Sequence, residues 1–200
     1  MAVNPFETRW IKPAEVRFIP VGFKSICRLL KKLSAKGYRG EIVGPHGVGK
    51  STLLQTLKRE LTRQDISVTL LYARGPFPHT GPPQTITSLK PHITPNAVLL
   101  VDGFEQLSWW TRRQLKRQTA QAHSGLVVTT HQSQKLPELI KLQTTLQTVT
   151  ELITQLQTDR SVQRLISEQD AKMLYQQFGN NVREILFACY DLYEQRKANL

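Results

Sequence analysis

The chain has 200 residues, of which 40% are hydrophobic, and a formal net charge of +12. This length allows one α/β domain with a buried core and a short helical appendage. Continuous apolar runs such as residues 97–101 are far shorter than the roughly 20 residues that span a bilayer, and residues 1–7 lack the pattern of a secretory signal. We therefore expect a cytoplasmic protein with no membrane span.

The first half of the chain predicts alternating helices and strands. Residues 21–36 place apolar side chains at helical spacing with lysines and arginines between them, which is typical of an amphipathic helix. A short apolar strand at 41–43 precedes a glycine-rich loop, and leucines at helical spacing over 51–61 indicate a second helix. Residues 68–72 are β-branched or large and apolar, so we expect a second buried strand there.

The middle of the chain contains a proline-rich connection followed by two strongly apolar runs. The prolines between residues 75 and 95 leave room only for a brief helix at 85–89. The runs 97–102 and 125–130 are typical of parallel strands buried on both faces. A basic helix at 109–122 lies between them.

The last part of the chain predicts one more strand and several helices. A fifth strand is expected at 139–142, and a helix with an apolar inner stripe follows over 146–156. Ser167 and Asp170 have the spacing of a capping box, Gly179 is a candidate C-cap, and a second apolar-faced helix follows. The alternation predicts an α/β fold with a doubly wound, mainly parallel five-stranded sheet and a small C-terminal helical appendage.

The two cysteines, Cys27 and Cys189, each fall within an apolar helical pattern. Neither has a neighbouring cysteine or histidine at metal-site or redox spacing. We therefore expect two core thiols.

A glycine-rich loop lies between the first predicted strand and the following helix. It matches G-x-x-x-x-G-K-[ST], in which glycines let backbone N–H groups converge on phosphate and the helix N-terminus adds positive potential. Lys50 is expected to reach the β- and γ-phosphates of the nucleotide, and the Ser51 hydroxyl is expected to ligate Mg²⁺. The predicted nucleotide-binding residues are Gly44, Pro45, His46, Gly47, Val48, Gly49, Lys50, Ser51 and Thr52.

An acidic residue ends the apolar run 98–101. Asp102 therefore has the pattern of a Walker B aspartate, whose carboxylate supports Mg²⁺ opposite Ser51. The alternative is an aspartate that only caps the next helix, because strand-terminal aspartates are also common helix N-caps.

The loop 44–51, Asp102 and the strand ending at Thr130 together resemble the additional-strand P-loop ATPases, the division that holds the AAA-type and ABC-type enzymes. The resemblance covers about residues 40–156. It implies the sheet order 5-1-4-3-2, with ATP and Mg²⁺ as ligands and hydrolysis of the β–γ phosphoanhydride. It also fits a nucleotide-dependent homo-oligomer.

The expected domain division follows from the same motifs. Residues 1–158 form a P-loop nucleotide-binding domain that includes the N-terminal amphipathic helix, and residues 159–200 form a short helical hairpin or lid.

The chain departs from this division at the water-activating glutamate. Gly103 holds the position where that glutamate is most often found, and the nearest carboxylate is Glu105. Glu105 is either the general base or an exposed acid at a helix start, because a base must lie within hydrogen-bond reach of the attacking water. The alternative function is thus a nucleotide-dependent regulatory switch with little hydrolysis.

Polar residues end the fourth predicted strand, where the γ-phosphate is expected. Thr130 resembles the AAA sensor-1 residue, and the pair Thr130-His131 resembles the switch histidine of ABC ATPases. A histidine that only caps the strand is the alternative. No signature loop of the L-S-G-G-Q type is present, which disfavours a transporter ATPase.

Two terminal segments extend the resemblance to AAA proteins. Residues 179–184 resemble the G-N-V-R-E start of the sensor-2 helix with one inserted asparagine, so Arg183 is either a γ-phosphate contact or a surface arginine. The segment 4–6, Asn-Pro-Phe, resembles the N-terminal segment that packs beside adenine in AAA proteins.

Other nucleotide-binding classes fit less well. GTPases carry an N-K-x-D segment after a strand, and the chain has none at the corresponding places, so ATP is the expected nucleotide. Small-molecule kinases need an arginine-bearing lid between the fourth and fifth strands, where only Lys135 lies.

The positive charge is concentrated in the predicted helices. Arg112, Arg113, Lys116 and Arg117 crowd one helix beside the pair Trp109-Trp110. This pattern fits a surface for nucleic acid or for an acidic protein. The alternatives are a solvated helix face and tryptophans that pack in the core.

Overall fold

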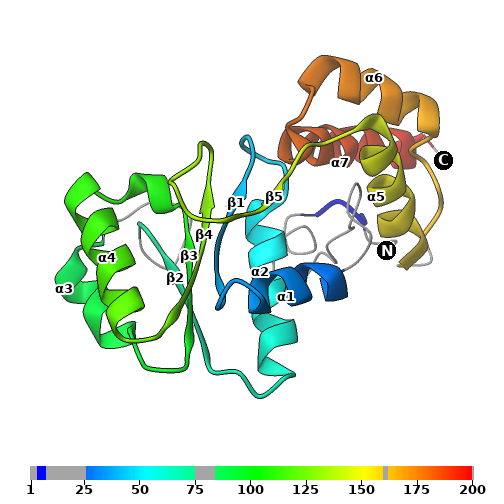
Figure 1. The fold of residues 1–200 in the computed structure, drawn as a ribbon. Coiled ribbons are helices and arrows are strands. Elements are labelled where there is room, and N and C mark those ends of the chain that lie inside the picture. The colour runs from blue at the N-terminus through cyan, green and yellow to red at the C-terminus, as the bar shows by residue number, and fades with distance from the viewer. Residues whose placement is uncertain (1–3, 8–25, 75–83, 160–161, 200) are drawn as a thin grey trace.

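A computed structural model describes residues 4–7, 26–74, 84–159 and 162–199. Its strands form one parallel sheet in the order β2-β3-β4-β1-β5 (Figure 1). The strands are β1 (Arg39–Val43), β2 (Val68–Tyr72), β3 (Val98–Asp102), β4 (Gly125–Thr130) and β5 (Glu138–Lys141). This order confirms the predicted fold class, with β4 between β1, which precedes the glycine-rich loop, and β3, which ends at Asp102.

The helices lie on both faces of the sheet and in a separate group at one end (Figure 1). The α-helices are α1 (Ile26–Ser34), α2 (Lys50–Thr62), α3 (Ile86–Leu89), α4 (Trp109–Gln121), α5 (Leu146–Asp159), α6 (Glu168–Phe178) and α7 (Val182–Ala198). Two short 3-10 helices are η1 (Lys90–His92) and η2 (Phe104–Gln106). Of the expected first helix, residues 21–25 lie outside the described residues, as do residues 75–83 of the proline-rich connection.

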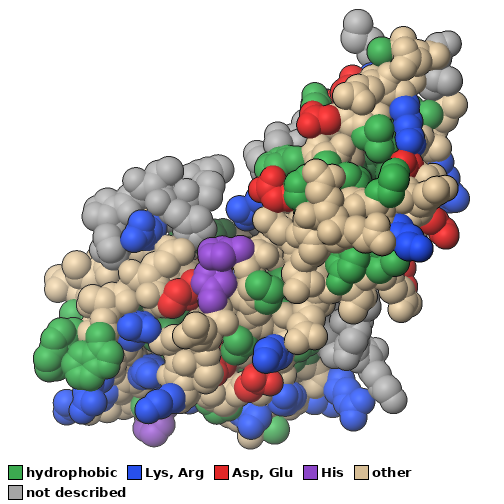
Figure 2. Space-filling model, turned by 90° about the horizontal axis from the view of Figure 1, so that it is seen from above, with side chains coloured by type: hydrophobic (Ala, Val, Ile, Leu, Met, Phe, Trp, Pro, Cys, Tyr) green, Lys and Arg blue, Asp and Glu red, His purple; other side chains and the backbone are tan. Residues whose placement is uncertain are grey.

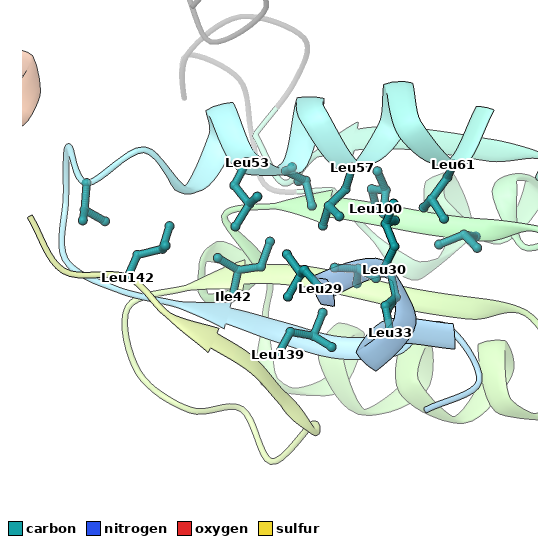
Figure 3. Close-up of a cluster of buried hydrophobic side chains, with 14 residues drawn as sticks. Leu29, Leu30, Leu33, Ile42, Leu53, Leu57, Leu61, Leu100, Leu139 and Leu142 are labelled. Atoms are coloured by element: carbon teal, nitrogen blue, oxygen red, sulfur yellow. The ribbon is translucent and has the colours of Figure 1, made fainter. Parts of the chain in front are cut away.

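Helices cover both faces of the sheet, and successive residues of β3 and β4 point to one face and then to the other. Val98, Leu100 and Val127 pack against α1 and α2 in a leucine-rich cluster (Figure 3). Their neighbours in the strands, among them Leu99 and Val128, pack on the opposite side with α3, α4 and η2. Every residue of β3 and β4 is therefore buried, as expected for central strands of a parallel sheet.

A third hydrophobic cluster joins α5, α6 and α7 with Phe6. Figure 1 shows these helices grouped at the end of the sheet beyond β5, beside the segment 4–7. Because α5 shares this cluster with α6 and α7, we propose that the helical unit starts near Leu146 and not at residue 159, the boundary that the motifs predict.

Caps and an ion pair fix the helical unit. Ser167 and Asp170 form the predicted capping box, and Gly179 is the C-cap of α6 with a φ of 57°. Arg196 of α7 donates to both carboxylate oxygens of Asp170, at 2.6 and 2.7 Å. These contacts hold the pKa of Asp170 at about 2, mainly through the hydrogen bonds from Arg196. The start of α6 is thereby tied to the end of α7.

Two sequence expectations about burial are wrong. Cys189 is buried, and burial raises its pKa to about 12, but Cys27 is exposed because α1 buries its face at Leu29, Leu30 and Leu33 instead. All five residues of β2 are only half-buried, because β2 is the edge strand of the sheet and pairs with β3 alone. No helix in the described part of the chain is long and apolar enough to cross a bilayer.

Candidate nucleotide-binding site

The loop 44–49 lies between β1 and α2, at the carboxyl edge of the sheet. The first residue of the loop lies beside the end of β4, because the Gly44 N–H donates to the Thr130 carbonyl at 3.1 Å. Gly47 and Gly49 have φ values of 72° and 91°, a region that side-chain-bearing residues rarely adopt. Gly49 is also the N-cap of α2 and has no side chain with which to cap it. The first N–H groups of α2 are thus suited to bind an anion.

Lys50 folds back over this loop. Its Nζ donates to the carbonyls of Gly44 and Pro45, both at 2.6 Å. Burial lowers the pKa of Lys50 to about 8, although the nearby carboxylates of Glu105 and Asp102 act to raise it. The structure therefore brings Lys50, Glu105 and Asp102 close enough to interact electrostatically.

Asp102 ends β3 and is held by a threonine of the neighbouring strand. The Thr129 hydroxyl donates to Asp102 Oδ1 at 2.5 Å and accepts the Gly103 N–H at 2.8 Å. Both side chains lie on the sheet face that α2 covers, because they continue the alternation of Leu100 and Val127. Asp102 thus faces the helix that begins with Lys50 and Ser51.

Thr129, and not Thr130, occupies the position beside Asp102. The Thr130 hydroxyl donates to the Gln132 carbonyl at 2.7 Å, within its own chain segment. Side chains of successive strand residues point to opposite faces of the sheet. The alternation along β4 therefore indicates that Thr129, and not Thr130, faces the same side as Asp102.

A left-handed turn at Gly103 sets the direction of the chain after Asp102. Gly103 has a φ of 75°, and η2 follows at once with Phe104 fully buried. This turn places the Glu105 carboxylate at 2.9 Å from His131 Nδ1. The second carboxylate oxygen, Oε2, is buried and has no hydrogen-bond partner among the described residues. Glu105 thus lies in the first turn of η2 with a side chain that is only partly exposed.

His131 lies between Glu105 and the phosphate loop. Its ring centroid is 3.8 Å from that of His46, with the planes tilted by 42°. Burial lowers the pKa of His131, and Lys50 and His46 lower it further, whereas Glu105 and Asp102 raise it. A neutral imidazole with the proton on Nδ1 donates to Glu105. Figure 2 shows histidine side chains gathered at the surface beside the indentation between the sheet and the helical unit.

The helical unit reaches the phosphate loop through Asn181. A Cβ built on Gly47 would lie 2.1 Å from Asn181 Oδ1, and this oxygen is buried without a hydrogen-bond partner among the described residues. Thr144 fixes the approach, because its hydroxyl donates to the Asn180 carbonyl and its own carbonyl accepts from the Tyr175 hydroxyl, both at 3.1 Å. Asn181 belongs to the segment 179–184 that resembles the start of the sensor-2 helix, but that resemblance predicts only Arg183 as a site residue.

Arg183 lies on the first turn of α7, two residues beyond Asn181, and its side chain is exposed. The structure does not place it among the buried groups of the site, so its γ-phosphate contact stays a prediction.

The segment 4–6 lies in the helical unit. Asn4 donates to the Tyr190 carbonyl and to Glu194 Oε1, at 3.2 and 2.8 Å, and its own Oδ1 accepts the Phe6 N–H. The Phe6 ring packs edge-on against Tyr193 with the centroids 6.0 Å apart. The adenine contact that the sequence resemblance implies for this segment also stays a prediction.

Solved structures share this arrangement of strands and helices. Domain III of the replication initiation protein DnaA from Thermotoga maritima matches with a TM-score of 0.58 and 14% identity, over 86% of this chain and 83% of that chain. A mutant of RuvB from Thermotoga maritima matches with a TM-score of 0.57 and 16% identity, over 82% of this chain and 61% of that chain. A DNA replication initiation factor matches at 0.55 and 14%, over 86% and 62%.

The chain therefore spans less than two thirds of the RuvB chain that it matches. No protein-family model and no curated protein matches the sequence. The fold of the chain is that of the additional-strand P-loop ATPases, as the sequence resemblance predicted.

Proposed function

We propose that this chain binds Mg²⁺-ATP at residues 44–52 and hydrolyses its β–γ phosphoanhydride. The observation that carries the proposal is the Glu105 carboxylate, which interacts electrostatically with Lys50. One of its oxygens is held by His131, and the other is buried with no hydrogen-bond partner in the described part of the chain. An unpaired buried carboxylate oxygen is costly, so it indicates a water or ligand as its partner.

The residues at the site fit this ligand. Gly47 and Gly49 hold the left-handed backbone that a phosphate-binding loop requires, and Lys50 can exchange two loop carbonyls for phosphate oxygens. The Ser51 hydroxyl and the Asp102 carboxylate supply the oxygen donors that Mg²⁺ prefers. When bound, Mg²⁺ neutralises charge on the β- and γ-phosphate oxygens.

Each residue near the γ-phosphate has a role in the proposed reaction. Glu105 accepts a proton from the attacking water, whose oxygen bonds to the γ-phosphorus while the bond to the β–γ bridging oxygen breaks and ADP leaves. His131 orients the Glu105 carboxylate through its Nδ1–H. Thr129 holds Asp102, and Lys50 stabilises the charge of the transferring group.

A nucleotide switch with little hydrolysis is the second candidate. The observation in its favour is the resting state of Lys50, which is bonded to the carbonyls of Gly44 and Pro45 while Asn181 lies against Gly47. In this candidate ATP would rearrange the loop and shift the helical unit, because it binds the two arrangements with different affinities.

Turnover measurements separate these candidates. We expect Glu105→Gln to retain ATP affinity and to lower kcat by about 10² to 10⁴, the usual contribution of a general base. Glu138→Gln, at an exposed acid on β5, is the matched control and should leave kcat unchanged. If the wild type binds ATP but hydrolyses it no faster than Glu105→Gln does, the switch is favoured. If the wild type does not bind ATP, both candidates are rejected.

A further inference from the structure

Two tryptophans lie exposed at the start of α4. Trp109 and Trp110 are 56% and 66% exposed, and their ring centroids are 4.7 Å apart at an interplanar angle of 78°. The helix is anchored beneath them, because Ser108 caps Thr111 N–H and the buried face consists of Thr111, Leu115 and Thr119. The sequence left open whether this pair packs in the core, and the structure places it on the surface.

The cations of α4 divide into two groups. Arg112 donates to the Gln134 side chain, and Lys116 Nζ donates to the Gln134 carbonyl at 2.9 Å, so both are turned toward the β4–β5 loop. Arg113 and Arg117 are exposed, and the Arg113 guanidinium lies 5.6 Å from the centroid of the Trp109 ring.

The exposed residues form one continuous face. Positions 109, 113 and 117 recur every four residues, which places them on one side of a helix. We call Trp109, Trp110, Arg113 and Arg117 the tryptophan–arginine face. Figure 2 shows exposed hydrophobic side chains bordered by Lys and Arg at the end of the molecule where α3 and α4 lie.

We propose that the tryptophan–arginine face binds single-stranded nucleic acid. The sequence of α4 contains four cations and no acidic residue, so the face attracts a polyanion. Exposed indole rings stack on unpaired bases, and arginines beside them contact the phosphates of the same strand. In a duplex the base faces are already stacked on one another, so the rings favour a single strand.

This proposal is independent of the proposed ATPase activity. The face is made of side chains on the exposed side of α4, and none of the four contributes to the groups around Lys50, Asp102 and Glu105. A variant of the face can therefore be tested in the intact chain with its thermal unfolding as a measure of correct folding.

The experiment is fluorescence anisotropy of a labelled single-stranded oligonucleotide of about 20 nucleotides, which covers the usual site sizes. We expect binding that weakens with salt, with a slope of about −0.7 per phosphate contact in a plot of log affinity against log salt. Replacing Arg113 and Arg117 by alanine should flatten the slope by about 1.4 if each contacts one phosphate. Replacing Lys31 and Lys36 by alanine removes the same charge from an exposed region around α1 and should not change the slope.

A second set of measurements tests whether the tryptophans stack on bases. We expect Trp109→Ala with Trp110→Ala to weaken binding of the oligonucleotide by about 5- to 150-fold for each base that loses its stacking partner. An abasic strand of the same length should bind the wild type and this variant equally. Absence of binding at low salt, equal affinity for duplex of the same sequence, or equal competition by polyglutamate would overturn the proposal, the last by indicating an acidic protein partner.

Discussion

Asn181 and Gly47 are in contact, although one begins the last helix and the other belongs to the phosphate loop. The Asn181 Oδ1 atom lies where a side chain at position 47 would begin, at 2.1 Å from an ideal Cβ. Asn181 therefore links the helical unit to the proposed nucleotide site.

This contact predicts that a charge at position 181 weakens ATP binding. Asn181→Asp brings a carboxylate to the phosphate loop, and two like charges within about 6 Å cost about 2 to 3 kcal/mol at an effective dielectric constant of about 20. We expect ATP affinity to fall by about 30- to 150-fold, measured by calorimetric titration. Asn181→Ala is the uncharged control and should bind ATP within a few-fold of the wild type. Equal affinities of the Asp and Ala variants would place the phosphates away from Asn181.

The lowered pKa of Lys50 predicts that ATP affinity depends on pH. Its pKa is about 8 in the free protein because the side chain is buried, and phosphate oxygens would raise it by favouring the charged form. Binding then takes up a proton at and above pH 8, so the affinity should be constant below about pH 7 and fall toward tenfold per unit above pH 8.

Calorimetry in buffers with different ionisation enthalpies measures this proton uptake directly. Lys50→Arg retains a charge that does not titrate in this range, so any ATP binding that remains should lose this pH dependence. Proton uptake near zero at pH 9 in the wild type would contradict the contact between Lys50 and phosphate.

The backbone conformation of Gly103 predicts that a glutamate at this position, where the additional-strand P-loop ATPases most often have one, destabilises the protein. The residue has a φ of 75°, and a Cβ would lie 3.1 Å from the Gln106 side chain. We expect Gly103→Glu to lower the free energy of unfolding by about 1 kcal/mol or more and to leave turnover no higher.

A matched variant separates backbone strain from crowding. Gly37 has a similar φ of 61° with no atom within 4 Å of an added Cβ, so Gly37→Glu should show the strain alone in urea unfolding. A fully stable Gly103→Glu protein with raised turnover would show that Glu105 is not the base.

Much of the fold could be predicted because its signals are local. The apolar runs of β3 and β4, the glycines before α2 and the capping box at Ser167 each act through neighbouring residues. Which side of α1 faces the core was harder to predict, because apolar residues lie on two adjacent sides of the helix. The side with Leu29 is buried, and Cys27 is exposed.

Residues of the candidate site could be proposed from the sequence only where the motif is continuous or a residue ends a strand. Asp102 follows from its place at a strand end. The pairing of Glu105 with His131 depends on the left-handed turn at Gly103, and the approach of Asn181 to Gly47 depends on how the helical unit packs. Both are contacts between distant segments, which no spacing rule contains.

Gln134 connects the loop after His131 to α4, the helix that carries the tryptophan–arginine face. Its N–H donates to the buried carboxylate of Glu41 at 2.7 Å, and its carbonyl and side chain accept from Lys116 and Arg112 of α4. Gln134 also lies three residues after His131, the partner of Glu105. If His131 shifts on nucleotide binding, the movement can reach α4 through the contacts of Gln134 with Arg112 and Lys116.

We expect nucleotide state to change the affinity for a single-stranded oligonucleotide, which rests on both proposals. Coupling of this kind is typically worth about 1 to 3 kcal/mol, or about 5- to 150-fold, and the oligonucleotide should change ATP affinity by the same factor. Anisotropy titrations with a non-hydrolysable ATP analogue, with ADP and without nucleotide measure it. Gln134→Ala should reduce the difference between these states while nucleotide-free binding persists, because the variant loses the Arg112 contact and retains Arg113 and Arg117. Gln132→Ala removes an exposed side chain of the same loop and should retain the coupling, so equal loss in both variants would mean that the loop as a whole, and not the Gln134 contact, carries it.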